Sequence, residues 1–95
     1  MPRKEWTDEE YLITMYLYRF GYDDLGMNYT QIAEIMGRTP NSIIMRFGNY
    51  LAVENGKSGL NGGGRKSHEM YEKYKDCSRE ELRKIVIKSL INLKQ

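Results

Sequence analysis

The sequence has one cysteine, one histidine and no long apolar run in its 95 residues. A single cysteine, Cys77, excludes an internal disulfide and a cysteine-rich zinc site. The lone histidine, His68, has no second metal ligand or base spaced near it. No stretch is apolar over the length needed to cross a bilayer. We therefore expect no cofactor, no metal, no catalytic residue and no membrane partner, and we predict that the protein is not an enzyme.

The composition is that of one small globular domain. Apolar residues make up 40% of the chain, and the 29% of charged residues mix both signs, which is not typical of a disordered protein. The segment MPRKEWTDEE becomes acidic at once and lacks the apolar stretch of a signal peptide. These features predict a soluble, cytoplasmic protein.

The charges are distributed unevenly, although the net charge is only +2. Residues 1–55 contain five basic and eight acidic side chains, whereas residues 56–95 contain ten basic and five acidic ones. The stretch 35–53 nevertheless has no acid and contains two arginines, Arg38 and Arg46. A second acid-free stretch, 55–68, contains Lys57, Arg65 and Lys66. Two locally basic segments therefore exist in a nearly neutral chain.

Capping boxes predict where the first two helices begin. Thr7–Glu10 and Asn28–Gln31 both place a short polar side chain three residues before Glu or Gln. Trp6 can pack on Tyr11 across the first of these helix starts. Gly21 is a typical C-cap for the first helix.

The stretch 28–51 has the form of a helix-turn-helix. Gly37 is placed to end the second helix in a left-handed conformation. Thr39 caps a third helix, and Pro40 takes its first position, where no amide donor is needed. A helix-turn-helix places its second helix in a DNA groove.

We predict an all-α fold with a three-helix helix-turn-helix core, a Gly-rich loop and one or two further C-terminal helices. Residues 1–53 form the predicted DNA-binding core. Residues 54–67 form a Gly-rich basic loop. Residues 68–95 form a helical extension that packs on the core or on a partner.

The third predicted helix is the candidate for contacting DNA. If Ile43, Phe47 and Leu51 face the core, the opposite face presents mostly polar side chains. Asparagine pairs well with adenine, arginine with guanine, and an apolar side chain with a thymine methyl group. The predicted contacts are Arg38, Thr39, Asn41, Ser42, Met45, Arg46 and Asn49. The alternative is an ordinary polar surface on a packed three-helix core.

Several motifs resemble one family. The segment Trp6–Glu10, the pair Ile32–Ala33, the turn Gly37–Thr39 and Arg46 resemble the Myb/SANT-type three-helix domain. Tyr29 stands where that family would place a second tryptophan. The resemblance covers about half of the chain and implies that the third helix enters the major groove.

A second resemblance extends further along the chain. The segments GRTPNSIIMRFGNYLA and GLNGGG are similar to the DNA-binding region that precedes HNH nucleases in some bacterial restriction-type proteins. No nuclease part follows here, so this resemblance implies binding and not cleavage. It implies that Arg38, Asn41, Ser42, Met45 and Arg46 face DNA.

The Gly-rich loop is a candidate for phosphate contacts. Its spacing does not match a nucleotide-binding phosphate loop, because Arg65 stands at the lysine position. We expect Lys57, Arg65 and Lys66 to follow the DNA backbone or to reach a minor groove. A solvated linker is the alternative.

The last predicted helix has more apolar residues than a small core needs. Ile87 and Ile91 add to the stripe of Leu82, Ile85, Val86, Leu90 and Leu93. We predict that this surface forms a homodimer.

The function predicted from these features is non-enzymatic binding of double-stranded DNA. The protein would be a regulator of transcription or a specificity module, of phage, mobile-element or bacterial origin. The alternative is a small inhibitor or adaptor that binds a host or defence nucleic-acid enzyme. The low net charge and the acidic first helix favour that alternative.

Overall fold

The computed structural model describes residues 5–56 and 64–94. In that part of the chain the elements are α1 (Asp8–Phe20), a short 3-10 helix (Asp23–Leu25), α2 (Tyr29–Met36), α3 (Pro40–Glu54), α4 (Gly64–Tyr74) and α5 (Arg79–Lys94). No strand occurs among these described residues, so the predicted all-α class is confirmed. None of the described helices is long and apolar enough to cross a membrane.

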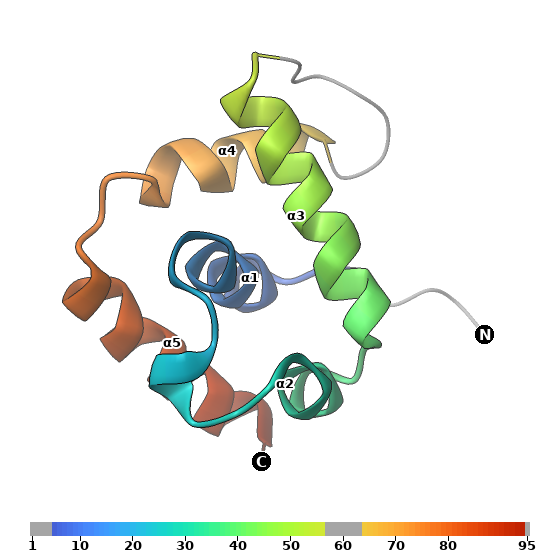
Figure 1. Cartoon of the computed structure of the whole chain (residues 1–95), viewed down its shortest axis with the longest axis vertical. Helices are drawn as coiled ribbons and strands as arrows, with labels where there is room; N and C mark the ends of the chain where they lie inside the picture. Colours follow the sequence, from blue (N-terminus) through green and yellow to red (C-terminus); the bar gives the residue numbers. More distant parts are fainter. Residues whose placement is uncertain (1–4, 57–63, 95) are drawn as a thin grey trace.

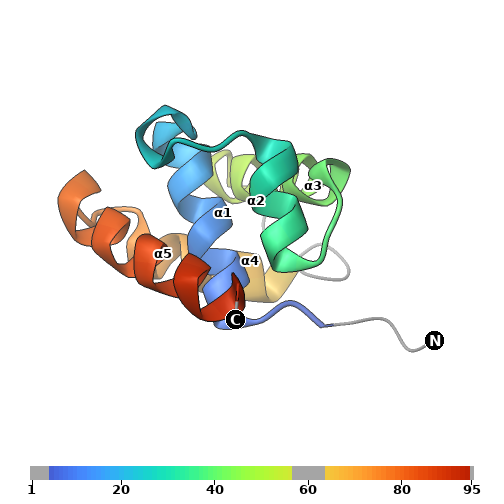
Figure 2. The same ribbon diagram turned by 90° about the horizontal axis from the view of Figure 1, so that it is seen from below.

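Helix α1 lies at the centre of the molecule. Figures 1 and 2 show it between α3 on one side and α5 on the other, and it also packs on α4. Every residue from 10 to 17 is buried, which is expected of a helix that is covered on all sides. The core therefore forms around α1, and the other helices are positioned by it.

The helix boundaries follow the sequence signals. The capping boxes at Thr7 and Asn28 are both formed, as predicted. A third box forms between Ser78 and Glu81 at the start of α5. Gly37 ends α2 in the left-handed conformation, with φ of 73°, where a side chain would be strained. These local signals set where α1, α2 and α5 begin and where α2 ends.

A buried hydrogen-bond group joins α1 to α3. The Tyr50 hydroxyl donates to the Tyr11 carbonyl oxygen at 2.9 Å and lies 2.9 Å from Thr14 Oγ1. Thr14 Oγ1 in turn lies 3.0 Å from the carbonyl oxygen of Glu10, one turn earlier. Burial raises the pKa of Tyr50 well above its usual range, so the hydroxyl stays protonated and its bond to the Tyr11 carbonyl is kept. This group fixes the distance between the two helices.

Helix α5 belongs to the same core as the first three helices. Its side chains Leu82, Val86 and Leu90 are buried in one cluster with residues of α1, α2 and α3. Arg19 of α1 donates to the carbonyl oxygens of Tyr74 and Cys77, which precede α5. The apolar surface of α1, α2 and α3 is therefore completed by α5.

Three boundary and burial predictions need correction. The predicted loop 54–67 is too long, because α3 extends to Glu54 and α4 begins at Gly64. Leu51, which was predicted to face the core, is 50% exposed, whereas Tyr50 is fully buried. A helix turns about 100° per residue, so a position eight residues after Ile43 is rotated by about 80° from it, whereas the seventh is rotated by only about 20°.

The apolar residues of α5 are divided between core and surface differently from the prediction. Ile85 was expected in the buried stripe, yet it is 43% exposed, because Leu82 and Val86 occupy the side that faces the core. Ile91 is 54% exposed, and Ile87 and Leu93 are partly buried. The homodimer through this surface stays a prediction.

Candidate nucleic-acid interface

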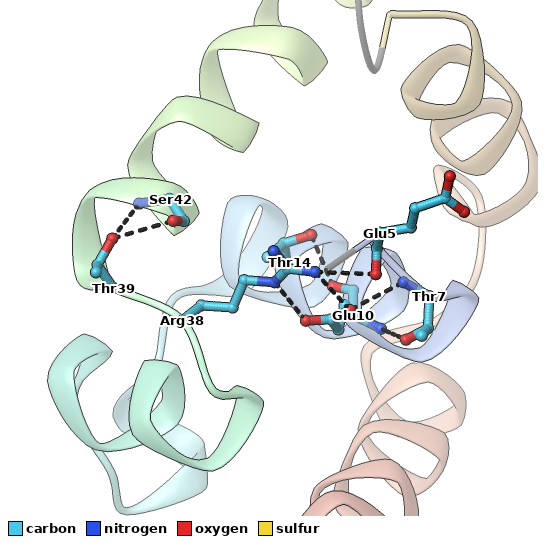
Figure 3. Close-up of polar contacts among 7 residues, drawn as sticks. All are labelled: Glu5, Thr7, Glu10, Thr14, Arg38, Thr39 and Ser42. Atoms are coloured by element: carbon cyan, nitrogen blue, oxygen red, sulfur yellow. Dashed lines mark hydrogen bonds and ion pairs between the residues drawn. The ribbon is translucent and has the colours of Figure 1, made fainter. Parts of the chain in front are cut away.

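The turn between α2 and α3 sets the direction of α3. The Arg38 amide donates to the Ala33 carbonyl oxygen at 2.8 Å and closes the end of α2. The Thr39 hydroxyl accepts the Ser42 amide at 3.3 Å and lies 3.0 Å from the Ser42 hydroxyl, as Figure 3 shows. Pro40 stands in the first turn. The start of α3 is therefore capped and exposed, and its positive end suits a phosphate.

One face of α3 is open to solvent. It consists of Asn41, Ile44, Met45, Gly48 and Leu51, which are all exposed, and we call it the α3 outer face. Ile44 is 49% exposed and Met45 is 73% exposed. A Cβ atom placed on Gly48 would meet nothing within 4 Å. This face has no carboxylate, so it has no charge that repels a phosphate backbone.

Arg38 is held by a buried carboxylate. Its Nε lies 2.7 Å from Oε2 of Glu10, and its Nη2 donates to Oε1 at 3.2 Å and to the Glu5 carbonyl oxygen at 3.0 Å. The Glu10 side chain is fully buried, and that of Arg38 is 11% exposed. Figure 3 shows Arg38 reaching from the turn to the start of α1. The pair therefore attaches the helix-turn-helix to α1.

Arg46 is held on the side of α3 that faces α4. Its Nη1 donates to Ser67 Oγ at 2.9 Å and to Asn49 Oδ1 at 3.1 Å. Its guanidinium carbon lies 4.3 Å from the ring centroid of Trp6 and 4.7 Å from that of Tyr11. Cation–π contacts of this kind stabilise a partly desolvated arginine. Arg46 therefore joins α3 to α1 and α4.

Trp6 connects the two arginines. The guanidinium carbon of Arg38 lies 4.7 Å from its ring centroid, close to the distance found for Arg46. The Trp6 ring also packs on Tyr11, with centroids 5.6 Å apart, as predicted for the helix start. The segment before α1 is thus part of the support for α3.

The predicted DNA-contacting residues fall into three groups. Asn41 and Met45 lie on the α3 outer face. Thr39 and Ser42 form the cap at the start of the helix. The other three are engaged within the protein: Arg38, Arg46 and Asn49. The expected polar face with free arginines thus differs from the observed one, and DNA contact by these seven residues stays a prediction.

The predicted basic loop is only partly described. Lys57 lies outside the described residues. Arg65 is exposed in the first turn of α4, and Lys66 pairs with Asp8 at 3.0 Å. The hydrogen bond to Asp8 raises the pKa of Lys66. The sites of these two cations are therefore set by α4 and not by a loop.

Three residues of the α3 outer face are not among the contacts predicted from the sequence: Ile44, Gly48 and Leu51. The signal was available, because residues 41, 44, 45 and 48 follow the helical repeat. This repeat was not recognised as an exposed face, because Ile44 is apolar and Leu51 was expected to be buried.

Comparison with known families shows to which protein family the chain belongs. The chain matches the Myb-like DNA-binding domain over residues 6–85. It belongs to the Myb-like DNA-binding domain family. The match covers α1 to α4 and the first part of α5, well beyond the half of the chain that carried the predicted resemblance. Comparison with curated proteins and with solved structures gave no match.

Membership in the Myb-like family supports DNA as the partner. It confirms the predicted Myb/SANT resemblance, whereas the link to regions that precede HNH nucleases stays a prediction. Within residues 5–56 and 64–94, no group of three or more His, Cys, Asp or Glu side chains is placed to hold a metal ion.

Proposed function

We propose that this Myb-like protein binds duplex DNA without catalysing a reaction and acts as a regulator or specificity module. In this proposal α3 enters the major groove with the α3 outer face toward the bases. The observation that most favours it is the exposed, carboxylate-free α3 outer face, located directly after a capped helix start. A helix of this exposure and position is the part of a helix-turn-helix that contacts base edges.

Two arginines in the acid-free stretch have a supporting role in this proposal. Arg38 and Arg46 hold α3 against α1 through Glu10 and Trp6. Backbone contacts then come from the capped start of α3 and from Arg65 at the start of α4. A rigid helix is an advantage, because a reading face must be held in one orientation to discriminate between bases.

Duplex binding as a function of salt tests the proposal. The affinity of the whole chain for random-sequence duplex DNA is measured by fluorescence anisotropy between low and physiological ionic strength. We expect the logarithm of the affinity to fall linearly with the logarithm of the salt concentration, with a slope of about −0.9 for each phosphate contacted. No binding to any duplex at low salt would refute the proposed function.

One observation favours a second candidate, the binding of another protein. Three of the five residues on the α3 outer face are large and apolar, and Ile44, Met45 and Leu51 are each about half or more exposed. Apolar side chains are common at the centre of protein interfaces. This candidate predicts an affinity for a protein partner that depends on Ile44 and Met45 but hardly on salt, which separates it from DNA binding.

A further inference from the structure

The α3 outer face has an unusual composition for a surface that contacts DNA. It presents the apolar side chains Ile44, Met45 and Leu51 and one carboxamide, that of Asn41. Arg46 is the only basic residue of α3, and its guanidinium is engaged by Ser67, Asn49 and two rings. Arg38, in the preceding turn, is engaged by Glu10. The face therefore combines apolar surface with a single amide.

The chemistry of base pairs indicates which sequences suit such a face. In the major groove the only apolar group on any base is the 5-methyl group of thymine. Asparagine pairs with N6 and N7 of adenine, whereas guanine is contacted mainly by arginine or lysine. Ile44 and Met45 follow Asn41 on the same side of the helix, about one turn further on. An amide and an apolar pair one turn apart match neighbouring A·T base pairs.

We propose that the α3 outer face discriminates A·T from G·C base pairs by direct contact of Ile44 and Met45 with thymine methyl groups. This inference rests on the proposed function and adds the class of DNA sequence that is bound. The open space over Gly48, where even a Cβ atom would touch nothing within 4 Å, allows the helix to approach the bases closely.

The engaged arginines strengthen the inference. Contact with guanine would require Arg38 to leave a fully buried carboxylate at 2.7 Å, or Arg46 to leave Ser67 and the Trp6 ring. Removing one member of a buried ion pair leaves the other charge without compensation, which is strongly unfavourable. The apolar contacts need no such rearrangement, because Ile44 and Met45 are already exposed.

The test removes only the methyl groups. Duplexes that bind are first selected from a random-sequence pool, and the best one is compared with the same duplex in which deoxyuridine replaces every thymidine. A methyl group taken out of water contributes about fourfold in affinity, so we expect two contacts to lower the affinity by about 15-fold on replacement. The selected duplexes should be rich in A·T pairs.

Protein variants separate direct contact from a change in DNA shape. Ile44→Ala and Met45→Ala should each weaken binding to the thymidine duplex and reduce the difference between the two duplexes. Ile91→Ala is the matched control, because Ile91 is an isoleucine of similar exposure on α5. It should leave that difference unchanged. Circular dichroism verifies that each variant keeps its helices.

The outcomes distinguish this inference from the proposed function. Equal affinity for the thymidine and deoxyuridine duplexes, or selection of G·C-rich duplexes, would overturn the inference and leave DNA binding in place. The inference would also be overturned if Ile44→Ala and Met45→Ala did not change the difference in affinity between the thymidine and deoxyuridine duplexes. Failure to select any duplex would overturn both, and it would favour a protein partner on the same apolar face.

Discussion

Nε of Arg38, in the turn before α3, lies 2.7 Å from Oε2 of Glu10, in the first turn of α1. The same carboxylate accepts the Thr7 amide at 2.9 Å and so completes the capping box. One buried side chain therefore fixes the start of the central helix and attaches the helix-turn-helix to it. The orientation of the proposed DNA-contacting helix depends on this pair.

Arg38→Met should destabilise the protein strongly. It removes the cation and leaves the Glu10 carboxylate buried without its ion pair, which costs about 3–5 kcal/mol. Urea unfolding followed by circular dichroism measures this loss. The control is Lys66→Met, which breaks a surface pair with Asp8 and should hardly change the unfolding midpoint. A loss for Arg38→Met as small as that of the control would contradict the assigned role.

Leu82→Ala should show that α5 is part of the core. Leu82 is fully buried among residues of α1 and α2, and a buried Leu→Ala change typically lowers the free energy of unfolding by about 2–5 kcal/mol. Ile91→Ala, at an exposed position of the same helix, should change it by less than about 0.5 kcal/mol. A similar change in the free energy of unfolding for the two variants would mean that α5 is not part of the hydrophobic core.

Alkaline pH should destabilise the protein through its tyrosines. Burial, followed by the hydrogen bond to Glu54, raises the pKa of Tyr18 to about 12, whereas an unfolded tyrosine ionises near about 10. Between these values the unfolded state loses a proton that the folded state keeps, so unfolding becomes more favourable as pH rises. In urea unfolding, Tyr18→Phe should make this decline shallower and leave the profile between about pH 7 and 9 parallel to that of the wild type. An equally steep decline would contradict the assignment.

Asn41→Ala and Arg65→Ala should weaken DNA binding in different ways. Loss of a base contact at Asn41 costs about 1–3 kcal/mol for the preferred sequence and leaves the salt dependence unchanged. Loss of a phosphate contact at Arg65 weakens all duplexes alike and reduces the salt slope by about 0.9. Asn92→Ala, an exposed asparagine on α5, is the control. Identical effects of the two variants on sequence preference and salt slope would contradict the division into base and backbone contacts.

Local signals made much of the fold predictable. Capping residues such as Thr7, Asn28 and Thr39 act within one helical turn, so the sequence alone places the helix starts. The burial of Leu51 was predicted wrongly, although the helical repeat already places Tyr50, seven residues after Ile43, closer to the side that faces the core. The start of α4 was also missed, because glycines disfavour a helix locally and the contact of Ser67 with Arg46 is a tertiary one.

The candidate site was harder to predict than the fold. The sequence shows that Arg38 and Arg46 lie in an acid-free stretch, but it does not show that Glu10 and Trp6 come close to them in space. Ion pairs between residues 28 positions apart in the chain leave no periodic pattern. The exposed face of α3 therefore has fewer available charges and more apolar side chains than the sequence predicted.

Mapping the DNA contact on the amides of the protein tests the central claim most directly. In a titration of the ¹⁵N-labelled chain with duplex DNA, we expect the largest chemical-shift changes at residues 39–48, at the start and on the outer face of α3, and smaller ones at Arg65. Changes confined to α5, around Ile85 and Ile91, with α3 unaffected, would contradict the claim that α3 enters the major groove.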